Sequence, residues 1–323
     1  MSKILASDDR TWSLASAVDA LTESARIAGR PSLLWLAGFF YPGVGLGLGL
    51  GWSWILRSIE NAESDESSTW VLAPMRLGAL GANGGFTSLL VGTLAVGCAA
   101  PLLFPLLLPI FRLIVGLAGW ASQATAAARG GLRDAWRHGR GNTLSSGALW
   151  VQCWMLVVIA AAVFLIPVVA LVHAAKLPRG DAVASGALPH PVTVLVSAPS
   201  SLVVLVYALA ISILFQLALH SLAQNRRGAG SALVHAWRLA RRDPWATIRA
   251  LIGDSLLSFL YWIAFWILLG LWHVPVFGGV ALAAYIALGG FVGVTRALYW
   301  ARAYRALGGL SPADGVPGLA QAS

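Results

Sequence analysis

Two stretches of this sequence repeat one pattern: Ala135-Trp136-Arg137-His138-Gly139-Arg140-Gly141-Asn142 and, 101 residues later, Ala236-Trp237-Arg238-Leu239-Ala240-Arg241-Arg242-Asp243. Each stretch is basic, carries one Trp and stands just before a long apolar run. Arginine stems and a Trp ring suit the boundary between lipid headgroups and hydrocarbon, where a helix lies parallel to the membrane. The pattern therefore predicts a surface helix that leads into a pair of membrane-spanning helices.

The composition of the whole chain indicates the same environment. Of its 323 residues, 58% are hydrophobic and 11% are charged, and the mean hydropathy is +0.75. A soluble domain carries about 25% charged residues and cannot hide this much apolar surface. Several apolar runs reach the roughly 20 residues that a span needs. The sequence therefore predicts an all-α fold, a polytopic transmembrane helical bundle with amphipathic interfacial helices ahead of its hairpins.

The apolar runs divide the chain into units. We expect spans at 32–56, within 86–126, and at 148–174, 199–222, 248–271 and 276–299. Amphipathic helices are expected at 13–30, 126–140 and 231–242, and Asp243-Pro244 ends the third because the residue before a proline disfavours helix. The units are a cytoplasmic N-terminal segment at 1–31, three membrane units at 32–126, 127–225 and 226–308, and a disordered tail at 309–323.

The basic residues set the orientation. Of the 22 Lys and Arg, 17 fall before residue 32, at 127–147, at 224–249 or after residue 295, whereas four lie in the other loops. Cytoplasmic loops carry an excess of Lys and Arg, so the four rich segments are expected in the cytoplasm. Six spans with both termini cytoplasmic satisfy this rule, and seven spans are the alternative because 86–126 is long enough for a tight hairpin. The expected location is the bacterial cytoplasmic (inner) membrane.

The net charge of +9 is concentrated beside the apolar runs, a pattern that favours a bilayer with anionic headgroups over nucleic acid. A membrane-protein partner or a second copy of the chain is the other expected contact. The residues expected to make these contacts are the arginines and tryptophans of the two basic helices: Arg129, Arg133, Trp136, Arg137, Arg140, Trp237, Arg238, Arg241 and Arg242.

Two ionisable residues, Arg112 and Asp254, lie nearest the membrane interior. An unpaired charge there costs roughly 2.5–3.5 kcal/mol. One hypothesis is that the two residues form a buried pair or line a polar cavity. The other is that Arg112 reaches the interface along its stem and that Asp254 lies close to the interface. In the first span, Gly43, Gly47 and Gly51 recur at every fourth position and predict close helix packing.

No pattern of residues predicts catalysis. The histidines at predicted span ends, His173, His220 and His273, do not have the spacing of metal ligands. Neither a nucleophile elbow nor a pair of carboxylates in an apolar setting is present in the sequence. We therefore expect no metal, no cofactor and no enzymatic activity.

Three places in the sequence carry a resemblance to known families. They are the first span running into Gly51-Trp52-Ser53-Trp54-Ile55-Leu56-Arg57-Ser58-Ile59, the stretch Ala236-Trp237-Arg238-Leu239-Ala240-Arg241-Arg242-Asp243-Pro244, and the end Tyr304-Arg305-Ala306-Leu307-Gly308-Gly309. In these places the chain resembles bacterial multi-pass membrane protein families of unknown function, including relatives of the membrane domain fused to glycerophosphoryl diester phosphodiesterases. The resemblance implies a membrane location, and it implies no phosphodiesterase activity because that soluble domain is missing.

Three functions fit these expectations. The first is a non-enzymatic membrane scaffold, assembly factor or accessory component, favoured by the scarcity of polar residues inside the apolar runs. The second is a transporter or channel-like permease built from repeated hairpins, which requires a central polar cavity. The third is a lipid-handling protein, which the basic helices at the cytoplasmic leaflet favour.

Overall fold

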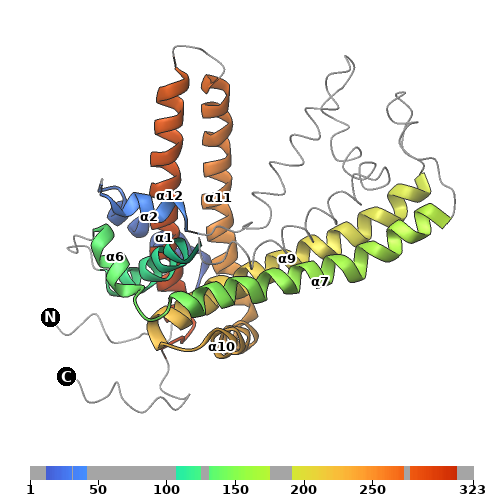
Figure 1. Cartoon of the computed structure of the whole chain (residues 1–323), viewed down its shortest axis with the longest axis horizontal. Helices are drawn as coiled ribbons and strands as arrows, with labels where there is room; N and C mark the ends of the chain where they lie inside the picture. Colours follow the sequence, from blue (N-terminus) through green and yellow to red (C-terminus); the bar gives the residue numbers. More distant parts are fainter. Residues whose placement is uncertain are drawn as a thin grey trace. The chain divides into compact units, whose positions relative to one another are not determined.

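The computed structural model of the protein describes residues 12–30, 32–41, 107–124, 131–174, 191–272 and 277–310. The regular structure of these residues is helical, as the sequence predicts (Figure 1). The helices are α1 (Leu14–Ala28), α2 (Leu34–Phe39), an unlabelled helix (Leu107–Gln123), α6 (Leu132–His138), α7 (Thr143–Ala174), α9 (Pro191–Asn225), α10 (Ala229–Arg242), α11 (Pro244–Trp272) and α12 (Gly278–Ala306).

Four helices contain segments that are long and apolar enough to cross a membrane. These segments are Thr143–Ala160 in α7, Val206–Asn225 in α9, Pro244–Leu268 in α11 and Gly278–Ala306, which is α12. They overlap the last four predicted spans. In the first predicted span, 32–56, α2 ends at Phe39 and residues 42–56 lie outside the described residues, so this span stays a prediction. In 86–126, the described helix Leu107–Gln123 is shorter than a span. The count of six spans stays a prediction.

The chain forms two compact units, each held together by its own contacts. Unit 1 comprises 1–44, 107–149 and 213–323, and unit 2 comprises 45–106 and 150–212. In unit 2, the described parts of α7 and α9 carry exposed apolar side chains, and the rings of Trp150 and Trp154 stack one helical turn apart. The three membrane units that the sequence predicts are a different division and stay a prediction.

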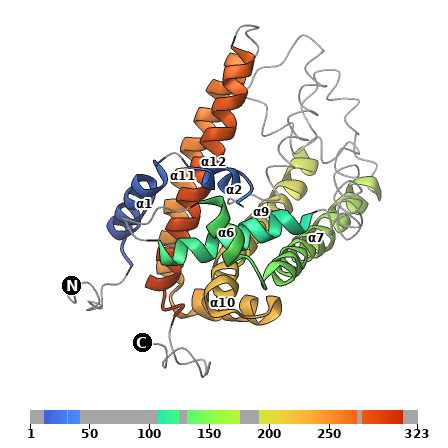
Figure 2. The ribbon, with the colours of Figure 1, turned by 60° about the vertical axis from the view of Figure 1, so that its left-hand side comes forward.

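Unit 1 is organised around α12. This helix runs antiparallel to α11, and both α1 and α2 pack against it (Figures 1 and 2). Residues 292–301 of α12 are buried without interruption, so this half of the helix is enclosed on all sides. The other half of the hairpin leaves many apolar side chains exposed, among them Phe259, Trp262 and Val280.

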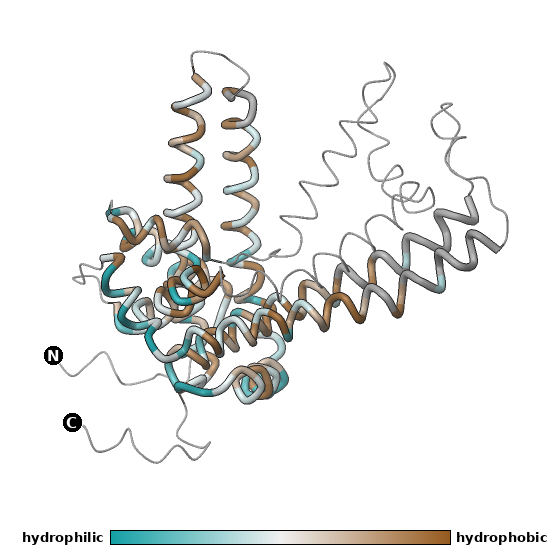
Figure 3. Tube along the Cα trace, in the orientation of Figure 1, coloured by the Kyte–Doolittle hydropathy of each residue, from teal (hydrophilic) through white to brown (hydrophobic). Residues whose placement is uncertain are grey.

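The amphipathic helices expected at 13–30 and 231–242 are present as α1 and α10, and the helix expected at 126–140 is the shorter α6. α10 carries both hydrophilic and hydrophobic residues, whereas the α11–α12 hairpin is mostly apolar (Figure 3). The predicted break at Asp243-Pro244 is confirmed. Asp243 Oδ1 accepts a hydrogen bond of 2.8 Å from the backbone N–H of Ala246, so the same residue that ends α10 caps α11.

Glycines bring the backbones of α2 and α12 into contact. A Cβ atom on Gly38 would meet the backbone oxygen of Gly290, and one on Gly293 would meet the backbone oxygen of Gly38. Backbone atoms cannot rotate away as a side chain can, so these positions admit hydrogen alone. The glycines expected to pack helices, Gly43, Gly47 and Gly51, lie outside the described residues. Gly38 lies five residues before Gly43, and it makes the kind of close backbone contact that was predicted for those glycines.

Replacing Gly293 by Ala tests this close approach. The new methyl group meets the backbone of Gly38, and overpacking of this kind costs about 1–3 kcal/mol. We expect Gly293→Ala to lower the thermal unfolding temperature of the detergent-solubilised protein. Gly279→Ala is the matched control, because it adds the same methyl group to the same helix at a position with open space around it. Equal unfolding temperatures for the two variants would contradict the packing described here.

Candidate functional site

A buried ion pair joins α11 to α12. Arg296 Nε donates to Asp254 Oδ1 over 2.6 Å, and the side chains of Arg296 and Asp254 are 7% and 0% exposed. A second guanidinium nitrogen of Arg296 donates to the hydroxyl of Ser258, one turn further along α11. Asp254 lies ten residues after the start of α11 and Arg296 ten residues before the end of α12. At 1.5 Å per residue, each charge is about 15 Å along its helix, so the pair lies at one level of the antiparallel hairpin.

The structure therefore does not bring together Arg112 and Asp254, the pair of the first hypothesis. Arg112 Nε donates over 3.0 Å to the backbone oxygen of Trp136, and its guanidinium lies 4.1 Å from the centre of the Trp136 ring. The cause is the packing of the helix Leu107–Gln123 on α6, in which Gly139 lies against the backbone of Arg112. Asp254 instead faces the helix that follows its own in the hairpin, and that helix supplies Arg296.

A second buried polar cluster is formed by α9 and Tyr41. The sequence predicts only the end of a span at this part of α9. The Tyr41 hydroxyl donates to Gln216 Oε1 over 3.1 Å and lies 3.1 Å from His220 Nε2. Gln224 Nε2 lies 3.4 Å from His220 Nδ1. If Gln224 donates to Nδ1, a neutral His220 carries its proton on Nε2 and donates it to the Tyr41 oxygen, which satisfies every contact. The sequence signal was available: Gln216, His220 and Gln224 are four residues apart in an apolar helix and so share one face.

The helix termini of unit 1 meet in a set of polar contacts. The N-terminal segment contacts α11 and α12, the turn before α7 contacts α9, and the end of α9 contacts the end of α12. The hydrogen bonds are Arg249 Nη1 to Trp12 O (2.9 Å), Arg302 Nη1 to Ala20 O (3.0 Å), Asn142 Nδ2 to Leu222 O (3.4 Å), and Asn225 Nδ2 to Tyr304 OH (2.9 Å) and Gly309 O (3.1 Å).

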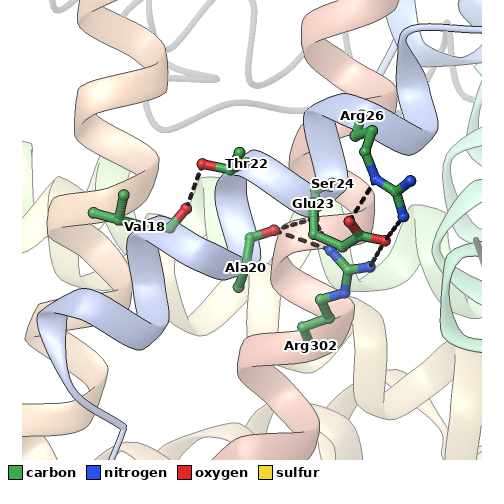
Figure 4. A network of polar contacts seen from close by, with 7 residues as sticks. All are labelled: Val18, Ala20, Thr22, Glu23, Ser24, Arg26 and Arg302. Atoms are coloured by element: carbon green, nitrogen blue, oxygen red, sulfur yellow. Dashed lines mark hydrogen bonds and ion pairs between the residues drawn. The ribbon is translucent and has the colours of Figure 1, made fainter.

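Arg302 fastens α1 to α12 (Figure 4). Its Nη1 donates to Ala20 O and, over 2.7 Å, to the hydroxyl of the buried Ser24. Nη2 of Arg302 lies 3.9 Å from Glu23, which also forms a bidentate pair with Arg26 at 2.7 and 2.8 Å. The hydrogen bond from Arg26 holds the pKa of the Glu23 carboxyl below its usual value. The anchor thus has a partly buried component on Ser24 and an exposed, acid-sensitive component on Glu23.

The residues expected to contact lipid or a partner are exposed wherever the structure describes them. On α6 and the turn after it, Arg133, Trp136, Arg137 and Arg140 face outward, and Arg129 lies outside the described residues. On α10, the exposed residues are Trp237, Arg238, Arg241 and Arg242. The two helices differ in one respect. The guanidinium of Arg112 lies 4.1 Å from the centre of the Trp136 ring and Trp136 is 37% exposed, whereas Trp237 is 51% exposed with the guanidinium of Arg241 5.8 Å from its centre.

The comparisons with known proteins identify a family. Residues 16–307 match DUF7847, a domain of unknown function. The chain belongs to this family. No curated protein and no solved structure matches the chain. In the described ranges, no group of three or more His, Cys, Asp or Glu side chains is placed to hold a metal ion.

Charge reversal tests the pairing of Asp254. We expect Asp254→Arg and Arg296→Asp each to cost about 3–5 kcal/mol, because each leaves buried charges without a counter-ion. The double variant restores opposite charges and should recover part of the folded, monodisperse fraction in size-exclusion chromatography. The control combines Asp254→Arg with Arg112→Asp, which should recover nothing. Rescue by this control in place of the Arg296 double variant would restore the Arg112 hypothesis.

Hydrogen exchange of α1 tests its anchor. Arg302→Ala removes the bonds to Ala20 and Ser24, and we expect it to speed backbone exchange across α1 by about tenfold or more, the effect of a charged hydrogen bond. Glu23→Gln should change exchange little at pH 7, because exposed ion pairs contribute little.

The pKa of Glu23 is lowered in the folded protein, so its stabilisation is present above the unfolded value and is lost as the pH falls through the folded value. Acid should therefore loosen α1 slightly in the wild type and not in Glu23→Gln. The same acid response in both proteins would contradict this assignment.

Proposed function

We propose that this protein is a polytopic integral protein of the bacterial cytoplasmic membrane that acts as a non-enzymatic scaffold, assembly or accessory component. Four membrane-length apolar helices support insertion. The exposed side of α11 supports it further: large apolar side chains recur along it at Ile248, Ile252, Leu256, Phe259 and Ile263. Such a face is costly in water and suited to hydrocarbon.

The contacts among the helix termini support a topology of six spans with both termini in the cytoplasm. The segments rich in basic residues are the N-terminal segment, 127–147, 224–249 and the end of α12. Each supplies a residue to the polar contacts that join these termini within unit 1. Segments that touch one another lie on one side of a membrane, and the positive-inside rule makes that side the cytoplasm.

Two internal polar contacts, at Asp254 and at His220, support the choice of a scaffold. Asp254 is held by Arg296, and His220 lies between Tyr41 and Gln224. Glycines bring α2 onto α12 with their backbones in contact. A transporter needs polar groups that exchange their partners for a substrate, whereas a scaffold needs a rigid body. The resemblance to multi-pass families of unknown function agrees with a membrane location.

Thiol labelling tests the topology. In a chain without its two native cysteines, Asp65→Cys and Ser185→Cys should react with a membrane-impermeant reagent added outside intact cells. Ser231→Cys, at the exposed start of α10, is the matched control and should react only after the membrane is permeabilised. Labelling of residue 65 or 185 from the cytoplasmic side alone would contradict the six-span topology.

Stoichiometry tests the scaffold. The tagged full chain is cross-linked in membranes, solubilised in mild detergent and purified over two columns, beside an unrelated membrane protein with the same tag. A scaffold should retain at least one membrane protein in a fixed molar ratio through both columns, and the unrelated protein should not. A chain that purifies alone and carries solute across proteoliposomes would be a transporter, and the scaffold would be rejected.

A further inference from the structure

An exposed face of α10 continues onto the first turns of α11. It consists of basic and large apolar side chains and is called here the α10 face: Val234, Trp237, Arg238, Arg241, Arg242, Trp245 and Ile248. Trp237 is 51% exposed and Trp245 is 69% exposed. The opposite side of α10 is buried through Ala232, His235, Ala236 and Leu239. The α10 face is therefore the outward side of a helix that is docked on the protein.

The structure shows which side of this helix can meet a membrane. The sequence predicts a surface helix at the boundary between headgroups and hydrocarbon. Ala236 and Leu239 pack into the protein, and the side that remains available carries three arginines flanked by Trp237 and Trp245. Such a face is suited to the headgroup layer, since guanidinium groups bind phosphate oxygens in pairs and Trp rings favour headgroup depth.

The α10 face is held at the end of a membrane-length helix. A single residue, Asp243, separates α10 from α11, and its carboxylate caps α11 through Ala246. The hydroxyl of Thr247 donates to the Asp243 backbone oxygen over 2.9 Å, which fixes the junction further. α11 begins at Pro244 and is apolar enough to span. If α11 spans, the arginines of α10 lie within a few residues of the hydrocarbon boundary, the depth of lipid phosphates.

The charge of the α10 face selects the lipid. Its exposed side chains are cationic or apolar, and the carboxylate nearest to them in the sequence, Asp243, caps α11. We infer that the α10 face binds the headgroups of anionic phospholipids in the cytoplasmic leaflet. This inference rests on the proposed membrane location and goes beyond the proposed scaffold. An acidic protein segment would match the charge as well, but two exposed Trp rings beside the start of a span favour lipid.

The test counts bound lipids. The purified full chain is titrated with phosphatidylglycerol or phosphatidylcholine in detergent, and lipid adducts are resolved by native mass spectrometry. The variant Arg238→Gln, Arg241→Gln, Arg242→Gln removes three charges and keeps helix-forming side chains. We expect it to weaken phosphatidylglycerol binding at least about tenfold and to leave phosphatidylcholine binding unchanged.

The control variant is Arg133→Gln, Arg137→Gln, Arg140→Gln, which removes the same charge from the α6 region, where Arg112 lies over the Trp136 ring and Trp136 is less exposed than Trp237. It should keep most of the phosphatidylglycerol binding. Equal loss in both triple variants would show diffuse charge attraction and overturn the inference. Competition by millimolar inorganic phosphate would show a site for a free anion and would also overturn the inference. The inference would be overturned as well if the α10 triple variant kept its lipid binding and lost an acidic partner protein.

A second variant keeps the inference testable if the triple variant does not fold. Trp237→Phe, Trp245→Phe preserves apolar side chains on the α10 face. The fluorescence lost in this variant reports on these two rings among the 15 Trp residues of the chain. Brominated phosphatidylglycerol should quench that difference more than brominated phosphatidylcholine, and equal quenching would overturn the inference. Extraction of the wild type by alkaline carbonate would instead reject the membrane location on which both proposals rest.

Discussion

The burial of Asp254 and Arg296 is the constraint on which unit 1 depends. Either charge alone would be costly inside an apolar hairpin, so α11 and α12 must be antiparallel and in the register that brings Nε of Arg296 to Oδ1 of Asp254. That register also sets the positions of the other residues of α12. Gly290 and Gly293 lie against α2, and Arg302, nearly two turns beyond Arg296, donates a hydrogen bond to α1.

Other polar side chains join further helices of unit 1 to this hairpin. Tyr41, just after α2, is held by Gln216 and His220 of α9, so the segment that packs on α12 is also tied to α9. Asn225 Nδ2 donates to the Tyr304 hydroxyl, which joins the end of α9 to the end of α12. Buried hydrogen bonds between helices favour the one arrangement of helices in which they can form. A body held in this way can present the arginines of α10 in a constant position, as a scaffold or a headgroup site requires.

The sequence predicted where helices form better than it predicted which helices pack against one another. Apolar periodicity and the Asp243-Pro244 break located α1, α10, α11 and α12, because these signals are local. The hypothesis of an Arg112–Asp254 pair missed the partner of Asp254 because residue spacing does not say which helices touch. Arg296 lies near the end of the predicted span 276–299 and was counted only with the basic residues of the C-terminal end. The contact between His220 and Tyr41 was missed for the same reason, because the sequence does not show which segment lies against α9. The amphipathic pattern of α10 was real, but a pattern does not tell whether lipid or protein covers the apolar side.

The most direct measurement is the contact between Asp254 and Arg296 in a bilayer. Solid-state NMR of the full chain in lipid, with ¹⁵N in arginine and ¹³C in the aspartate carboxyl groups, reports dipolar coupling between the two groups. A nitrogen–oxygen distance of 2.6 Å predicts a strong coupling that disappears in Arg296→Lys and persists in Arg112→Lys. A coupling that persists in Arg296→Lys, or that is lost in Arg112→Lys, would contradict the arrangement of α11 and α12 described here.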